Sequence, residues 1–393
     1  MISFFKKNTT TTLAIFAFLY ISLVYFNFAY SNIALIALSV LFILSVSFKL
    51  INIKLNISFL KNYLLIIVPF ILTLISIFIS DNKQIGYTFI IKRLSILLTP
   101  FILLIIFKEK EQFKKLTYVL LFFSLLALLI TVLNIFKEDV WRDFNHNNFK
   151  NSTIIQHPYF GIYQLVTIVF LLEFLKDTIN KKLFYLLLLM FSAGVLISTS
   201  RIAYILYLFI AFIYSLKYFT KKQAIIISSI IGVLFFSVVL SNKSISQKFT
   251  RSLSYKTSPR LKIWNNSYLV LKNSKQPLLG VGIGDYYEDK KEPYWLIGKV
   301  NALKGNYKGL YGYDSHNLYI EFILHNGLLG LSYTLLMLYT LYITLRKNDA
   351  FLISLAIILL LFSFTETIIN RQYGVILYVF IMPILIKFSK KSL

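Results

Sequence analysis

The sequence contains no cysteine and few acidic residues. Its 393 residues include no Cys and only 16 Asp and Glu, against 41 Lys and Arg. The lack of cysteine excludes disulfides, thiolate metal sites and a cysteine nucleophile. We also find no Walker loop and no Asp-x-Asp pair of the kind that holds a metal-bound nucleotide sugar. These absences remove several common classes of active site.

Hydrophobic residues are abundant and occur in long runs. They make up 58% of the chain, and the mean hydropathy is +0.72, which is too apolar for a water-soluble protein of this length. Each run of about 17–22 residues is long enough for a helix to cross a bilayer. We therefore predict an all-α membrane protein, with residues 1–393 forming a single polytopic domain. The twelve predicted spans are 13–30, 31–48, 62–79, 86–107, 116–136, 158–175, 183–200, 201–219, 223–241, 317–345, 350–366 and 372–388.

The basic residues predict the topology of these spans. If the N-terminus is cytoplasmic, twenty Lys and Arg lie in the inner segments and six in the short outer loops. By the positive-inside rule both termini are then cytoplasmic, and the long interval 242–315, between spans nine and ten, lies outside. Membrane topology accounts for most of the net charge of +25, and no nucleic-acid-binding motif is present. We expect a lipid bilayer, and no nucleic acid, as a partner.

The interval 242–315 is the main candidate for a functional site. It carries 13 Lys and Arg against five Asp and Glu, so its surface suits an anionic ligand such as a lipid diphosphate. A solvated loop that merely carries lysine is the alternative. Within it, residues 258–272 have the spacing of an amphipathic helix, on which Trp264 suits the bilayer interface.

Two residues of this region could take part in catalysis. His316 stands where the interval re-enters the membrane, and a neutral imidazole there could accept a proton from a sugar hydroxyl. Arg260 has a planar fork of donors that fits phosphate oxygens. The alternatives are an interfacial histidine that caps a helix and an ordinary loop arginine.

Other positively charged or glycine-rich positions have two interpretations each. Gly280, Gly282 and Gly284 lack the strand, helix and acidic partner of a dinucleotide site, so they form either a turn or a nest of amides near phosphates. Lys92 and Arg93 lie inside a span and either face a polar cavity or snorkel outward. Arg201 is either a second anion contact or a helix-end anchor.

Metal binding has little support in the sequence. Glu321 and His325 are four residues apart, but no dense ligand set accompanies them, and His146 and His157 lie in another loop. We therefore expect no metal and no cofactor. The sequence His325-Asn326-Gly327 instead predicts a bend in the tenth span.

Four short motifs, taken in order, resemble those of the O-antigen ligase and O-antigen polymerase superfamily of bacterial envelope glycosyltransferases. The resemblance covers about residues 199–345. The motifs are Thr199-Ser200-Arg201, Arg260 followed by Trp264, Pro277-Leu278-Leu279-Gly280-Val281-Gly282, and His316-Asn317-Leu318-Tyr319 leading into Gly327-Leu328-Leu329-Gly330.

The resemblance implies metal-independent transfer of a glycan at the periplasmic face of the inner membrane. The donor would be a glycan linked to undecaprenyl diphosphate, and the acceptor a hydroxyl of lipid A-core or of another glycan repeat unit. His316 would be the general base or would orient the acceptor. Arg260 and Arg201 would contact the diphosphate, with Lys92 and Arg93 as further contacts suggested by topology alone.

One loop departs from the family pattern. Before the sixth span the common members often carry a glycine and a Pro-Asn element, whereas this chain reads Ile155-Gln156-His157-Pro158-Tyr159. His157 is therefore either an acceptor contact or a helix-start residue. A ligase, a polymerase and a protein-directed oligosaccharyltransferase all remain open, and a polysaccharide exporter or lipid-linked glycan flippase is the alternative from another functional class.

Overall fold

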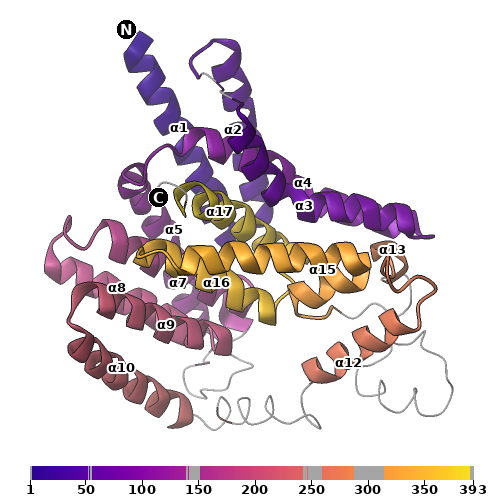
Figure 1. Cartoon of the computed structure of the whole chain (residues 1–393). Coiled ribbons are helices and arrows are strands. Elements are labelled where there is room, and N and C mark those ends of the chain that lie inside the picture. The colour runs from indigo at the N-terminus through magenta and orange to yellow at the C-terminus, as the bar shows by residue number, and fades with distance from the viewer. Residues whose placement is uncertain are drawn as a thin grey trace.

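The computed structural model describes residues 2–51, 53, 55–138, 140, 151–241, 246, 259–286 and 314–389, and these residues form helices joined by short turns (Figure 1). Much of the interval 242–315 lies outside the described residues. The elements are α1 (Ile2–Ser22), η1 (Leu23–Tyr25), α2 (Phe28–Ser47), α3 (Ile57–Ile79), α4 (Lys83–Ile106), α5 (Gln112–Lys137), α7 (His157–Phe174), α8 (Lys181–Ile197), α9 (Arg201–Tyr218), α10 (Lys221–Ser241), α12 (Pro259–Lys272), α13 (Ile283–Tyr286), α15 (Leu318–Leu345), α16 (Ala350–Thr365), η3 (Ile368–Asn370) and α17 (Gln372–Ser389).

The helices agree with the predicted class of membrane protein. Every predicted span overlaps a helix, and among the described residues 8 helices are long and apolar enough to cross a membrane. These are α2, α3, α4, α5, α7, α9, α15 and α17. Helix α16 is shorter, at 16 residues. The all-helical membrane fold is therefore confirmed, while the number of twelve spans stays a prediction.

Helices α7, α16 and α17 form the centre of the bundle. Nearly every residue of α17 is buried, which is typical of a helix that is hydrophobic on all sides and lies in the interior. Phenylalanine rings fill the space between it and its neighbours in edge-to-face pairs, such as Phe107 against Phe113 at 4.9 Å between ring centroids and Phe18 against Phe380 at 5.2 Å. This core holds the ends of the central helices in fixed positions.

The described part of the interval 242–315 contains α12 and α13. Helix α12 confirms the predicted helix at 258–272, but its buried face carries Ile263, Ser267 and Val270, whereas Tyr268 is exposed. The helix therefore packs on the protein through a face that mixes apolar and polar residues.

The glycine segment 277–286 closes onto two other parts of the chain. The amide of Val281 donates to the carbonyl of Leu324 (2.8 Å), and the amide of Ile283 donates to Oγ of Ser76 (2.7 Å). Helix α15 bends at Gly327, where φ is +52°, as the sequence predicted. A Cβ at Gly280 (φ +94°) would lie 2.5 Å from the backbone of His325, so only glycine allows this close packing.

Candidate active site

Several helix ends converge at one end of the bundle. The N-terminal ends of α9, α12 and α15 bring Arg201, Arg260 and His316 there, and the C-terminal end of α16 brings Glu366. A helix N-terminus carries a partial positive charge and exposed amides, which favours anions beside it. The fold thus gathers residues that lie up to 165 positions apart in the sequence, from Arg201 to Glu366.

Glu366 joins the two predicted catalytic residues. Its Oε2 lies 3.2 Å from Nδ1 of His316, and its Oε1 accepts a hydrogen bond from Nη2 of Arg260, also at 3.2 Å. The Glu366 side chain is only 7% exposed, whereas those of His316 and Arg260 are about one-third exposed. The carboxylate is therefore a buried link, and the histidine and the arginine present the accessible surfaces.

The backbone around His316 is held by several local hydrogen bonds. His316 adopts φ +48°, a left-handed conformation that is uncommon for a residue with a side chain. Its amide donates to Oδ1 of Asp314 (2.9 Å), and Nε1 of Trp264 donates to the carbonyl of Ser315 (2.8 Å). The side chain of Asn317 then caps α15 by accepting hydrogen bonds from the backbone amides of Tyr319 and Ile320. Trp264 thereby has a structural role beside the predicted base.

The protonation of His316 is controlled by opposing effects. Partial burial lowers the pKa of the imidazole, but the hydrogen bond to Glu366 and the charges of Glu366 and Asp314 outweigh it, so the pKa lies above its ordinary value. Because Nδ1 faces Glu366, the carboxylate favours the tautomer that carries its proton on Nδ1. Nε2 is then the ring nitrogen that can accept a proton.

A polar cavity of about 550 Å³ opens beside this pair. His316 and Glu366 belong to its lining, and Arg201 and Arg260 do not. Its other lining residues come from the segment before α7, from the start of α7 and from the start of α17. They are Asn151, Thr153, Ile154, Ile155, Gln156, His157, Pro158, Arg371 and Tyr373. The cavity therefore reaches the imidazole from a side that is distinct from the arginine pair.

Arg201 lies close to Arg260 at the start of α9. It is half-buried, and the two like charges are near enough to repel each other. Thr199, two positions before Arg201, has φ +48°, so Arg201 follows a left-handed turn, whereas His316 itself adopts the left-handed conformation. Two neighbouring guanidinium groups favour a ligand with more than one negative charge.

The two charged residues inside α4 take different positions. Lys92 is exposed, with its ammonium 4.8 Å from the centre of the Phe89 ring. Arg93 is buried and donates to Thr73, to the carbonyl of Ile369 and to Asn370. Arg93 therefore supports η3, the turn that follows Glu366.

The glycine run and the Glu321–His325 pair also serve the packing of the protein. The amides of Gly280, Gly282 and Gly284 donate to protein acceptors. Glu321 accepts from Nδ2 of Asn370 (2.9 Å) and lies 3.6 Å from Nε2 of His325. Within the described part of the chain no group of three potential metal ligands occurs, and His146 lies outside the described residues.

Sequence reasoning missed Glu366, Asp314 and Arg371. Asp314 accepts a hydrogen bond from Thr367 and lies 3.8 Å from Arg371, which donates to Gln156 (2.9 Å). The signal that could have revealed Glu366 was its rarity, because it is an acidic residue at the end of an apolar span in a chain poor in acids.

The comparison with known families places this geometry in context. No match is found among the curated proteins. Residues 185–335 match the family model described as O-Antigen ligase, and this stretch contains Arg201, Arg260 and His316. Glu366 lies beyond its C-terminal limit. Residues 185–335 of this multi-pass membrane protein are therefore similar to the O-antigen ligase family.

Proposed function

We propose that this protein transfers a glycan from undecaprenyl diphosphate to an acceptor hydroxyl, as an O-antigen ligase or an O-antigen polymerase. The observation that carries the proposal is the link through Glu366 between His316, which lines a polar cavity, and Arg260, whose charge also acts on Arg201. A base on one side and fixed positive charge on the other are the two parts that such a transfer needs.

The acceptor side of the reaction would use the polar cavity. A hydroxyl of the acceptor sugar donates its hydrogen bond to Nε2 of His316 and loses its proton to it as the oxygen attacks the anomeric carbon. Cavities of about 300–1,000 Å³ commonly hold small ligands, so 550 Å³ has room for a sugar residue. Gln156 and Arg371 also line the cavity and offer hydrogen-bonding groups to the acceptor, and His157 would be a further acceptor contact.

The donor side would use the arginines. As the new bond to the anomeric carbon forms, the bond from that carbon to the diphosphate oxygen breaks, and its electron pair leaves with the diphosphate, which stays on the lipid carrier. Arg260 and Arg201 would stabilise the growing negative charge on this leaving group. Two arginines can supply this stabilisation, so the proposed mechanism is metal-independent.

Glu366 would be a positioning residue. Its carboxylate fixes the orientation and tautomer of His316 and stabilises the imidazolium formed when the proton is taken up. It also holds Arg260 in place in the absence of donor. Arg93 forms buried hydrogen bonds with the η3 turn, and Thr367 donates a hydrogen bond to Asp314. These contacts hold Glu366 in position beside His316.

The proposed orientation puts this site on the periplasmic face of the inner membrane. The excess of basic residues in the opposite loops supports it, because cytoplasmic loops of membrane proteins are enriched in Lys and Arg. On that face the acceptor would be lipid A-core for a ligase, or a lipid-linked repeat unit for a polymerase.

The test is the gel profile of envelope glycans from a deletion strain complemented with wild type or with His316→Ala. Core bearing a single repeat in the deletion strain indicates a polymerase, and bare core with accumulated lipid-linked polymer indicates a ligase. If His316→Ala restores the normal ladder at normal protein level, the proposed base is wrong. An exporter or flippase would tolerate this change, so restoration would favour that alternative.

A further inference from the structure

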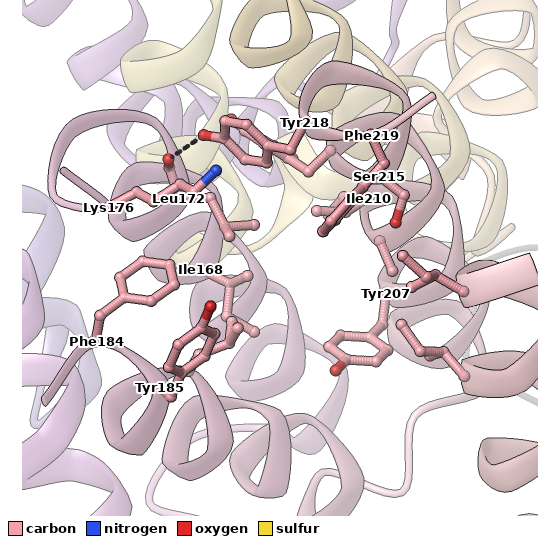
Figure 2. Close-up of a pocket in the computed structure, with 15 residues that line it drawn as sticks. Ile168, Leu172, Lys176, Phe184, Tyr185, Tyr207, Ile210, Ser215, Tyr218 and Phe219 are labelled. Carbon is pink, nitrogen blue, oxygen red and sulfur yellow. Dashed lines mark hydrogen bonds between the residues drawn. The ribbon is translucent and has the colours of Figure 1, made fainter. Parts of the chain in front are cut away.

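A second cavity lies at the end of the bundle opposite His316. It has a volume of about 300 Å³ and is enclosed by α7, α8, α9 and α10 (Figure 2). Helix α7 begins at the polar cavity and ends beside this second one, and its 18 residues span about 27 Å at 1.5 Å per residue. Ile168 is the first α7 residue that lines the second cavity, and it lies about 15 Å along the helix from Pro158, which lines the polar cavity.

The walls of the second cavity are apolar and reach the outer surface of the bundle. Figure 2 shows Ile168 and Leu172 of α7 facing Tyr207 and Ile210 of α9 across an open space. Tyr185 of α8, another lining residue, is 63% exposed, so the space is open to the surroundings of the bundle. At this depth those surroundings are lipid, which favours an alkyl chain as the occupant.

A cationic group stands at one end of this apolar space. The ammonium of Lys176 lies 3.0 Å from the centre of the Tyr218 ring, and Tyr218 itself is fixed by a hydrogen bond from its hydroxyl to the carbonyl of Leu172 (2.7 Å; Figure 2). A cation over an aromatic face is held in place while its remaining donors can bind an anion.

Further lysines surround this end of the cavity. Glu173 and Asp177 are the two acidic residues here, and Glu173 is paired with Lys217 (2.7 Å). The lysines in or next to the turns between α7 and α8 and between α9 and α10 are Lys176, Lys181, Lys182, Lys217, Lys221 and Lys222, of which Lys176 lines the cavity. Basic pockets between membrane helices at the cytoplasmic side commonly bind anionic lipid headgroups.

We propose that this second cavity binds an anionic phospholipid from the leaflet at its end of the bundle. One acyl chain would lie between α7, α8, α9 and α10, and the phosphodiester would contact Lys176 and the neighbouring lysines. Charge complementarity decides between occupants, because an apolar cavity alone would accept any acyl chain. The inference is independent of the proposed glycan transfer, since no residue of the His316 site takes part.

The experiment compares two lipids on the purified protein in detergent. Phosphatidylglycerol and phosphatidylcholine with identical acyl chains are titrated, and lipid retention is measured by native mass spectrometry. Two variants probe the two halves of the site: Lys176→Ala removes the cation, and Ala211→Trp fills the apolar space. Lys115→Ala is the matched control, because Lys115 is an exposed lysine of α5 and is not part of the lining.

We expect wild type and Lys115→Ala to prefer phosphatidylglycerol. Lys176→Ala should bind it about fivefold more weakly, since a juxtamembrane lysine contributes roughly 1 kcal/mol to anionic-lipid binding. Ala211→Trp should lose retention of both lipids at this site. Equal retention of the two lipids by wild type, or an unchanged preference in both variants, would overturn the proposal. Displacement of phosphatidylglycerol by equimolar undecaprenyl phosphate would also overturn it and assign the cavity to the donor lipid.

Discussion

Nδ1 of His316 lies 3.2 Å from Oε2 of Glu366, although the two residues belong to different helix ends separated by 50 positions in the chain. The geometry of this pair is that of a histidine oriented by a carboxylate, the arrangement that histidine general bases commonly use. Because the carboxylate is buried and the imidazole is partly open, the acid is shielded and the histidine can meet a substrate.

Replacement of the proposed base gives the first prediction. His316→Ala should lower the transfer rate about 10²- to 10⁴-fold, the usual contribution of a general base. Donor binding should stay near the wild-type level, because the arginines remain. The measurement is single-turnover transfer by purified protein together with donor binding. Loss of donor binding in His316→Ala with the fold intact would contradict a role limited to proton transfer.

The pH dependence of transfer should report the contact between His316 and Glu366. The base must be neutral, and Glu366 raises its pKa, so the acid limb of the rate profile lies at higher pH than it would for an unperturbed histidine. Glu366→Gln removes the charge, lowers the pKa of His316 and moves the acid limb to lower pH, while the plateau falls because orientation is weakened. Glu173→Gln, at the opposite end of the bundle, is the control and should leave the limb in place. If the acid limb of Glu366→Gln stayed at the wild-type pH, the group that titrates would not be His316.

The planar guanidinium of Arg260 can be tested with one variant that removes its charge and another that keeps it. Arg260→Ala should reduce transfer about 10²- to 10³-fold, as expected for loss of one group that stabilises developing negative charge. Arg260→Lys should recover only part of this, because an ammonium does not reproduce the planar fork. Arg346→Ala, an exposed arginine at the end of α15, serves as the control. Full activity of Arg260→Lys would show that charge alone is sufficient.

The glycine segment makes a prediction about stability. Gly280→Ala should destabilise the fold by about 1–3 kcal/mol or more, because φ is +94° and the new Cβ would lie 2.5 Å from the His325 carbonyl. Gly232→Ala is the matched control in α10, where nothing lies within 4 Å of the added Cβ, and the change should be neutral or stabilising. Thermal unfolding in detergent measures both. Equal melting temperatures would contradict the close packing.

Lys92 and Arg93 are neighbours in α4, and replacing each in turn compares the stability contribution of an exposed cation with that of a buried one. Arg93→Met leaves three neutral protein acceptors without their buried donor and should cost about 1–3 kcal/mol of stability. Lys92→Met should leave the melting temperature unchanged, since Lys92 is exposed. If the two variants had the same melting temperature, Arg93 would not stabilise the η3 turn as described.

The sequence alone predicted the helices well, because long apolar runs leave a chain in lipid almost no other structure. It also predicted the bend at Gly327 and the helix beginning near Arg260, where local residues decide the backbone. The buried face of α12 was not predictable from spacing. Asn266 and Ser267 are buried there because the helix packs against protein rather than against lipid.

The functional residues were predictable only in part. His316 and Arg260 stand in recognisable motifs, but Glu366 lies in no motif, and its role depends on contacts across 50 and 106 positions. The glycine run shows the opposite case. Its pattern allowed either a turn or a nest of amides near phosphates. Its amides form hydrogen bonds within the protein, partly to the Ser76 and Ser80 hydroxyls of α3 and the residue after it, which no local pattern reveals.

Both predicted ligand-facing motifs pass through a left-handed residue, Thr199 before Arg201 and His316 itself, each at φ +48°. Such a conformation costs on the order of 1–3 kcal/mol for a residue that carries a Cβ, and it is adopted only where surrounding contacts enforce it. Thr199→Gly should therefore raise the thermal stability of the protein, because glycine relieves the backbone strain at this position. The same substitution would make the turn before Arg201 more flexible and its side chain less well positioned. In this region a more stable variant should therefore be a less active one.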